Sequence, residues 1–296
     1  MQLLILGTAS QLPGKKRNHN GYYLRWLNEG FLFDPGEGTQ RQFSYAGTSP
    51  AKISRIFISH FHGDHCLGLP GIVHRLNLIQ VPNPIHLYYP ASGEQNIHNL
   101  LNGAQSHLRI NLEFHPIEED GIVYETNEYK VEAFALNHSV ETFGYRIIEF
   151  PRMNFDKKKL SDLKLKGVIL GELEKKGVII WQDKNIKRED ISTKRAGKIF
   201  SYVLDTGVCE NIDPLIKDAT LVIMESTYLS TESELAKKFK HLSADIAGKY
   251  AKDNNVKNLV LTHFSERYTD LSKFEDEVKP IFENVHIAKD LELLNY

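Results

Sequence analysis

A dense run of potential metal ligands follows the apolar, strand-like run RIFIS. The segment SHFHGDH at 59–65 supplies three imidazoles and one carboxylate within six residues. Imidazole nitrogen and carboxylate oxygen are ligands that borderline divalent metals such as zinc prefer. In a short loop, His60 and His62 can face one ion. Asp64 and His65 can then face a second. The run predicts a metal site, and a solvated histidine-rich turn is the weaker interpretation.

Three further candidate ligands each follow a predicted strand elsewhere in the chain. His138 follows VEAFALN, Asp205 follows FSYVL and His263 follows NLVLT. Taken singly, such a residue is more often a turn residue or a satisfied polar group than a ligand. Together with the first run they give five histidines and two aspartates, or three or so ligands per ion, with Asp205 able to bridge. An open position would remain for a shared hydroxide, which indicates hydrolysis and not a closed structural site.

Short apolar runs predict the strands that must hold these residues. Aromatic and β-branched side chains cluster at 3–7, 22–27, 31–34, 55–59, 85–90, 131–136, 143–148, 200–205, 221–225 and 258–263. After His65, the run CLGLPGIVHRLNLI has the length and apolar spacing of a helix. The order strand, helix, strand predicts a layered α/β fold. In such folds, side chains at strand ends face a cleft.

The composition limits the class of protein. With 296 residues, 41% hydrophobic and 25% charged, the chain is globular with a large core. A net charge of -2 does not indicate a general polyanion binder, so any nucleic-acid surface must be local. Only Cys66 and Cys209 are present, which predicts a reducing, cytoplasmic location. The opening MQLLILGTAS predicts a strand and not a signal peptide, and we expect no membrane span.

One segment departs from this charge balance. Residues 152–198 contain fourteen Lys/Arg and seven Asp/Glu, so this segment carries +7 and the remaining chain -9. A block of like charge is often only a solvated surface. This one lies between two predicted core strands and has Gly167, Gly171 and Gly177 spaced along it. We therefore expect a single domain over 1–296 with a basic arm inserted at 152–198.

The pattern H-x-H-x-D-H resembles the hallmark of the metallo-β-lactamase superfamily. Narrower matches are ILGTAS at 5–10, FDPGEGTQRQ at 33–42, SHFHGDHCLGLPGI at 59–72, NHSVETFGYRI at 137–147, VLDTGVCEN at 203–211, MESTY at 224–228, HLSADIA at 241–247 and LTHFSERY at 261–268. With these, the chain is similar to the ribonuclease Z family from Met1 to near its C-terminus. The resemblance implies an αβ/βα sandwich in which the basic insert is a tRNA-binding exosite arm.

The resemblance also implies an activity. Members of that family remove the 3′ trailer from precursor tRNA, usually as homodimers in which the arm of one subunit holds the tRNA for the active site of the other. The chain is then expected to be an endoribonuclease that binds two divalent metal ions per subunit, with zinc as the expected metal. A hydroxide activated by the two metals attacks the phosphodiester and leaves a 3′-hydroxyl on the tRNA.

Roles for individual residues follow from the same resemblance. It assigns ligands to two ions: His60, His62 and His138 to the first, Asp64, His65 and His263 to the second, and Asp205 to both. Asp64 is also the expected proton acceptor, and His241, oriented by Glu225, the expected proton donor. An imidazole paired with a carboxylate suits that task. Without the family motif, His241 is equally well interpreted as a surface residue capping the helix LSADIAGKYAKD.

Two further positions have alternative interpretations. Arg267 could hold a substrate phosphate by two hydrogen bonds or form a surface salt bridge. The segment at 37–39 could line the cleft, but a tight turn that positions Asp34 near the ligands is the stronger interpretation.

Two positions depart from the family pattern. Val168 follows Gly167 where the family's arm usually has Gly-Pro, and Leu204 precedes Asp205 where glycine is usual. Neither departure removes a ligand.

Two competing functions share part of this pattern. A small-molecule phosphodiesterase or another hydrolase of the metallo-β-lactamase fold would use the same dimetal core, but it needs no basic arm. A non-catalytic RNA-binding module would have no use for an open metal position. The arm, His241 and the HFSERY segment therefore favour the endoribonuclease.

Overall fold

The computed structural model describes residues 1–105 and 107–296. These form two compact units. The first contains Met1–Glu125, Val131–Ile147 and Ile199–Tyr296, and the second contains Thr126–Lys130 and Ile148–Lys198. The basic segment expected at 152–198 lies wholly within the second unit.

A seven-stranded sheet, in the order β18-β1-β2-β3-β4-β5-β6, forms one half of the first unit. Its strands are β1 Gln2–Gly7, β2 Gly21–Trp26, β3 Glu29–Phe33, β4 Ile53–Phe57, β5 Ile85–Pro90, β6 Leu112–Ile117 and β18 Leu293–Asn295. Strands β3 to β6 run parallel, whereas β18, β1 and β2 pair antiparallel. The ends of β3 and β4 therefore lie side by side.

A second seven-stranded sheet has the order β17-β16-β15-β14-β9-β8-β7. Its strands are β7 Gly121–Glu125, β8 Tyr129–Ala135, β9 Phe143–Glu149, β14 Ile199–Val203, β15 Leu221–Glu225, β16 Leu259–Thr262 and β17 Val285–Ile287. Strands β14 to β17 are parallel, so their carboxyl ends meet at one edge. Each of the ten apolar runs coincides with one strand of the two sheets, to within a few residues at its ends.

Buried aromatic rings join the two sheets. The Phe33 ring stacks on Phe57 with centroids 5.0 Å apart and on Tyr202 at 4.8 Å, and Phe57 packs against Tyr145 at 5.0 Å. Phe33 and Phe57 belong to the first sheet, whereas Tyr145 and Tyr202 belong to the second. Such rings bury large apolar areas and interlock in preferred geometries. They hold the end of β3, and therefore Asp34, against the second sheet.

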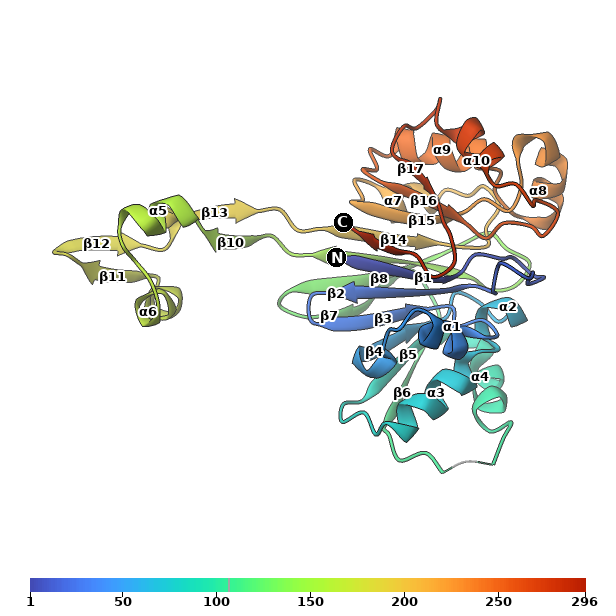
Figure 1. The fold of residues 1–296 in the computed structure, drawn as a ribbon, viewed down its shortest axis with the longest axis horizontal. Helices are drawn as coiled ribbons and strands as arrows, with labels where there is room; N and C mark the ends of the chain where they lie inside the picture. Colours follow the sequence, from blue (N-terminus) through green and yellow to red (C-terminus); the bar gives the residue numbers. More distant parts are fainter. Residues whose placement is uncertain (106) are drawn as a thin grey trace. The chain divides into compact units, whose positions relative to one another are not determined.

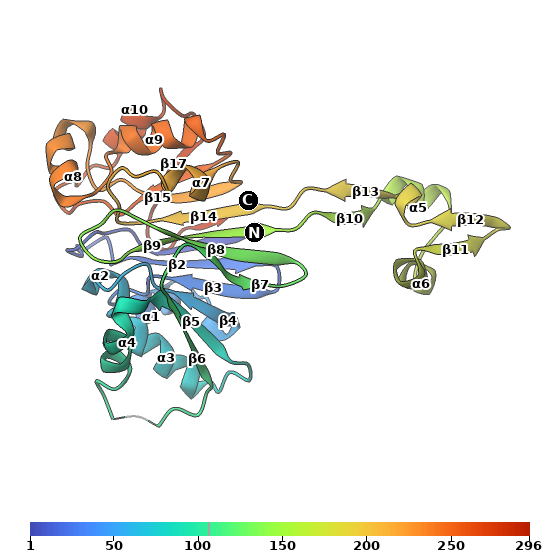
Figure 2. The same cartoon turned by 180° about the vertical axis from the view of Figure 1, so that it is seen from behind.

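Helices cover the outer face of each sheet. In Figure 1, α1 Thr39–Tyr45, α3 Leu69–Leu78 and α4 Glu94–Leu101 lie against the first sheet, with which they share an apolar core. Helices α7 Ile212–Ile216, α9 Ala244–Asp253 and α10 Ser272–Val278 contact the second sheet (Figure 2). The remaining helices of this unit are α2 Gly63–Cys66, α8 Ser233–Phe239 and the 3₁₀ turns η1 Pro50–Lys52, η2 Ala91–Gly93 and η4 Ser230–Glu232. The first unit is thus an αβ/βα sandwich.

The helix expected directly after His65 is interrupted. A short helix, α2, ends at Cys66, and α3 begins only at Leu69 with Pro70 in its first turn. Proline is well tolerated there because an N–H group in the first turn has no acceptor within the helix, so its absence costs no hydrogen bond. Among the described residues, no helix is both long and apolar enough to cross a membrane.

The second unit has a small apolar core of its own. Strand β10 Arg152–Phe155 pairs with β13 Ser192–Arg195, and β11 Val178–Trp181 pairs with β12 Lys184–Lys187. They accompany α5 Lys157–Asp162, α6 Val168–Lys176 and the 3₁₀ turn η3 Glu189–Ile191, around the buried side chains of Leu165, Leu173, Ile179 and Ile191. Val168 occupies the first position of α6 and is 90% exposed. That position accepts proline or valine, so this departure from the family pattern leaves the helix start intact.

Candidate metal centre

Three site residues follow strands in a strained backbone conformation. Asp34 directly follows β3, His263 directly follows β16, and Asp205 lies two residues beyond β14. Their φ angles are 43°, 60° and 50°, in the left-handed region that side chains with a Cβ disfavour. The positive φ falls on Asp205 itself, and Leu204 before it is fully buried. The turns at these strand ends carry strain at the same place as the potential ligands.

The seven predicted ligands lie together as two groups of donors. In each group, one ligand atom from every residue lies within 4.8 Å of the others: His60, His62, His138 and Asp205 in one group, and Asp64, His65 and His263 in the other. Helix α2 carries Asp64 and His65, so a single turn of chain presents both to the second group.

The Asp205 carboxylate lies between the two groups. Its Oδ2 is 3.6 Å from His60 Nε2, 3.8 Å from His138 Nε2 and 3.4 Å from His65 Nε2. Its Oδ1 is 3.0 Å from His263 Nε2. Because this one carboxylate faces histidines of both groups, it has the position required of a bridging ligand.

The outer ring nitrogens of four histidines have hydrogen-bond partners. These are Ser59 Oγ for His60 at 2.9 Å, Asp34 Oδ2 for His65 at 2.7 Å, Lys240 O for His138 at 3.2 Å and Thr227 Oγ1 for His263 at 2.7 Å. A ring nitrogen that meets a carbonyl or a carboxylate must donate. In the neutral imidazole this leaves an Nε2 lone pair turned inward, the orientation that metal-binding histidines adopt.

Asp34 organises this outer layer. Its fully buried carboxylate accepts hydrogen bonds from Ser59 N at 2.6 Å, Ser59 Oγ at 2.6 Å and Tyr202 OH at 2.8 Å, besides that from His65. Glu37 and Gly38 form the turn that leads into α1, and Thr39, the first residue of that helix, donates through Oγ1 to the Gly36 carbonyl. The geometry agrees with the interpretation that the turn positions Asp34.

The electrostatics of the donor groups favour a cation. Burial lowers the pKa of His60, His62 and His138, so these rings are neutral and able to bind metal near pH 7. Asp205 Oδ1 and His263 Nε2 are buried and lie 3.0 Å apart, but neither makes a well-formed hydrogen bond with a described residue. Such atoms are costly to bury without a partner, and a metal ion would satisfy both.

At His65 the carboxylates outweigh burial. Burial alone would lower the pKa of His65, but the carboxylates of Asp205, Asp64 and Asp34 raise it well above its usual value. The second group therefore attracts positive charge, which a divalent ion would also supply. We conclude that the residues present fit metal ions.

His241 and Glu225 form a hydrogen-bonded pair beside the two groups. His241 Nδ1 lies 3.0 and 3.1 Å from the two Glu225 carboxylate oxygens. Glu225 also accepts hydrogen bonds from Thr206 N and Thr227 Oγ1, both at 2.6 Å. The residue at the N-cap of α9 is Ser243, so His241 does not occupy the cap.

This pairing sets the charge of His241. Burial lowers the pKa of His241, but the Glu225 carboxylate more than offsets this and raises the pKa to about 9. The imidazole is thus protonated at neutral pH and can donate a proton. His241 also joins Asp205 and His263 in a further group of close donors, so it lies next to the ligands.

The donor groups open into a cavity of about 470 Å³. Its lining includes His62, Asp64, His138, Asp205, His241, His263, Tyr228, Lys238, Phe239, Lys240 and Arg267. Arg267 is exposed, and its guanidinium carbon lies 5.2 Å from the centre of the Tyr228 ring. It forms no ion pair with a described residue, so the salt-bridge alternative gains no support.

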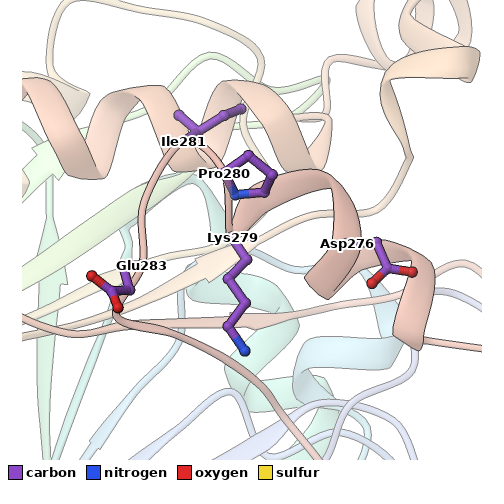
Figure 3. A pocket seen from close by; sticks show the side chains of 5 residues that line it. All are labelled: Asp276, Lys279, Pro280, Ile281 and Glu283. Carbon is purple, nitrogen blue, oxygen red and sulfur yellow. The ribbon is translucent and has the colours of Figure 1, made fainter.

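A second hollow and a separate cluster of donor residues also occur in the structure, and neither contains a predicted site residue. A hollow of about 620 Å³ beyond α10 places Lys279 between Asp276 and Glu283 (Figure 3) and contains no histidine. On β5 and β6, the residues His86, Glu113 and His115 form a separate group of three donors.

Sequence reasoning missed several partners of the site. Thr227, which contacts both Glu225 and His263, lies two residues after Glu225 in MESTY, and that proximity could have indicated it. Tyr202 could not be singled out from the sequence, because it is one of many aromatic residues in the apolar strands. Lys240 acts through its backbone carbonyl, which no pattern of side chains reports.

Comparisons with known proteins show the family of this chain. A family model described as "Anti-Pycsar protein Apyc1" matches residues 1–194, so the chain falls within that family. A protein of Protochlamydia amoebophila named Ribonuclease Z is 48% identical over 98% of this chain and 94% of its own length. The chain belongs to the ribonuclease Z family. A second Ribonuclease Z, from Nocardia farcinica, is 42% identical over 98% of this chain and 96% of its own length.

A solved structure agrees with the fold expected of the ribonuclease Z family. The human tRNase Z short form, ELAC1, has a TM-score of 0.74 at 24% identity and covers 100% of this chain and 99% of its own. At that identity the likeness concerns the fold alone. The expected metallo-β-lactamase αβ/βα sandwich is therefore confirmed, and with it a site suited to divalent metal ions.

We expect Asp34→Asn to weaken metal binding by about 10-fold to 100-fold, because the amide cannot hold Ser59 and His65 as the carboxylate does. Titration of the metal-free protein with zinc against a competing chelator measures the affinity. Asp253→Asn, an exposed aspartate at the end of α9, is the control. Equal affinities in a folded Asp34→Asn protein would contradict this role.

Proposed function

We propose that this chain is a metal-dependent endoribonuclease that removes the 3′ trailer from precursor tRNA and leaves a 3′-hydroxyl on the tRNA. Membership of the ribonuclease Z family, at 48% identity over nearly the whole chain, supports this substrate. One observation carries the proposal: His241, which the buried Glu225 holds by hydrogen bonds, lines the same cavity as members of both donor groups.

Two divalent ions per subunit, with zinc favoured by the nitrogen-rich donors, belong to the proposal. The residues that would hold them are His60, His62 and His138, then Asp64, His65 and His263, with Asp205 shared. When bound, such ions lower the pKa of water and offset negative charge on the phosphate.

Asp64 is the proposed acceptor of the proton of the attacking water. Its Oδ2 lies 3.2 Å from His65 Nε2 and 3.5 Å from His263 Nε2. Burial would raise the pKa of Asp64, but these two imidazoles hold it well below its usual value. The carboxylate is thus ionised across the physiological range, with the cavity before it.

His241 supplies the proton for the leaving 3′ oxygen. In-line attack breaks the bond between phosphorus and O3′, and the departing oxygen must gain a proton to become the 3′-hydroxyl. The Glu225 carboxylate holds the imidazolium in place and keeps it charged. Arg267, exposed at the edge of the cavity, is the proposed ligand of a substrate phosphate.

The basic segment 152–198 is the proposed tRNA-binding arm. It carries +7, whereas the rest of the chain carries -9, so phosphates would be attracted to this segment. We further infer a homodimer in which the arm of one subunit serves the active site of the other, as the family resemblance implies. Cytoplasmic action is supported by the free thiols of Cys66 and Cys209.

Cleavage of a 3′-extended precursor tRNA tests the function. The purified protein loaded with zinc is expected to make one cut after the discriminator base, and a chelator is expected to abolish it. The cut is mapped to the nucleotide on a sequencing gel. An intact precursor, together with hydrolysis of a small phosphodiester, would favour the small-molecule phosphodiesterase instead.

The pH profile tests the role of His241. A donor must be protonated, so activity is present below its raised pKa and is lost as pH rises through that value, about 9. Glu225→Gln removes the charge that raises the pKa. We expect kcat to fall and its alkaline limb to move toward lower pH by about one unit or more. With the exposed Glu283 changed to Gln as control, an unmoved limb in Glu225→Gln would exclude this pairing.

Salt dependence tests the arm. Replacing the exposed Lys158, Lys166 and Lys175 by alanine should raise KM for precursor tRNA. It should also reduce the slope of log affinity against log salt by roughly one per lost phosphate contact. Three exposed lysines of the first unit, at 217, 252 and 257, provide the matched triple variant.

Equal effects of the two triple variants would argue against a role of the arm in tRNA binding.

Mixing two variants tests whether the arm of one subunit serves the active site of the other. If subunits exchange, a mixture of arm-variant chains and Glu225→Gln chains should regain cleavage. In each mixed dimer, the intact arm of the Glu225→Gln chain can serve the intact active site of the arm-variant chain.

A further inference from the structure

A phenylalanine lies exposed at the cavity that holds the donor groups. Phe239 is 48% exposed and lines the cavity together with His138, Asp205 and His241. A single exposed apolar side chain on a protein surface is ordinary. An exposed aromatic ring beside the proposed site of phosphodiester cleavage has a chemical use, because every nucleobase has a flat face that can stack on it.

The backbone fixes Phe239 relative to a candidate metal ligand. It is the last residue of α8, and Lys240 after it caps the helix in a left-handed conformation with φ 55°. The Lys240 carbonyl accepts a hydrogen bond from His138 Nδ1 at 3.2 Å, and Lys240 Nζ donates to the His138 carbonyl at 2.9 Å. These reciprocal bonds couple the end of α8 to His138. The end of α8, and Phe239 with it, is therefore held beside the donor groups.

A second aromatic side chain in the cavity is less available. Tyr228 is only 8% exposed, and the Arg267 guanidinium lies 5.2 Å from its ring centre. Phe239 has a cation beside it as well, since Lys238 Nζ is 5.2 Å from the centre of its ring, but nearly half of its surface is free. An aromatic face next to an ammonium suits a nucleotide, which presents a base and a phosphate together.

We propose that Phe239 is a substrate-binding residue on which an unpaired nucleotide next to the scissile phosphate stacks its base, while Lys238 attracts the adjoining phosphate. The inference rests on the proposed endoribonuclease function and extends it. Stacking does not read the base sequence, so Phe239 would help to place any trailer. The contact adds binding beyond that of a small phosphodiester, which has no base.

The test compares the parent protein and two variants at Phe239 on a natural precursor and two abasic precursors. Phe239→Leu keeps an apolar side chain but removes the ring, and Phe239→Trp keeps a ring. The natural substrate is a precursor tRNA. Each abasic precursor is the same molecule with one abasic residue, either just before or just after the cleaved bond. We expect Phe239→Leu to lower kcat/KM on the natural precursor by about 10-fold or more, the usual range for loss of one stacked base.

The abasic substrate isolates the stacking. On one of the two abasic precursors the difference between the parent protein and Phe239→Leu should vanish, and Phe239→Trp should match the parent protein on the natural precursor. Tyr45→Leu is the matched control, because Tyr45 is exposed, has a cation beside its ring as Phe239 does, here Arg41, and does not line the cavity.

The failures are distinguishable. If the parent protein leaves the precursor uncut, the proposed function fails and this inference fails with it. If the parent protein cuts and Phe239→Leu cuts equally well, only the stacking role is overturned. An equal loss for Phe239→Leu on natural and on both abasic substrates would likewise overturn it, because the ring would then act through folding and not through a base.

Discussion

A buried carboxylate, that of Asp34, holds the site together. Burying a charge is costly unless it is fully hydrogen-bonded. Asp34 meets this requirement with Ser59, His65 and Tyr202, which come from three different parts of the fold. One carboxylate thus orients His65 directly and His60 through Ser59, and it ties the end of β3 to β14 in the other sheet. The aromatic layer around Phe33 supports the same junction.

The site separates its titratable groups by environment. Where burial dominates, as at His60 and His138, the imidazoles are neutral and suited to bind metal. Where a carboxylate dominates, as at His241, the imidazole is charged and suited to give up a proton. The same type of side chain thus has different charge states within one site, and the balance between burial and nearby carboxylates decides which.

Charge is also divided along the chain. A net charge of -2 conceals a segment at 152–198 that carries +7, and this segment forms most of a separate compact unit with its own core. An independent core allows the charged surface to vary without disturbing the sandwich that holds the ligands. The cavity itself has its own cations, Lys238, Lys240 and Arg267, next to the donor groups. Basic side chains therefore lie both in the second unit and in the lining of the cavity.

The sequence by itself predicted ten of the strands, the seven candidate ligands and the layered α/β fold, because apolar periodicity and ligand type are local properties that each segment carries. It did not reveal that helix formation stops at Cys66 and resumes at Leu69, nor that Thr227, Tyr202 and the Lys240 carbonyl complete the outer layer of the site. Those contacts join residues far apart in the chain and depend on the packing of two sheets. Only the tertiary structure decided that Asp205 lies between both donor groups and that His241 pairs with Glu225 instead of capping α9. A distance between strand ends is set by the whole fold, and no single segment encodes it.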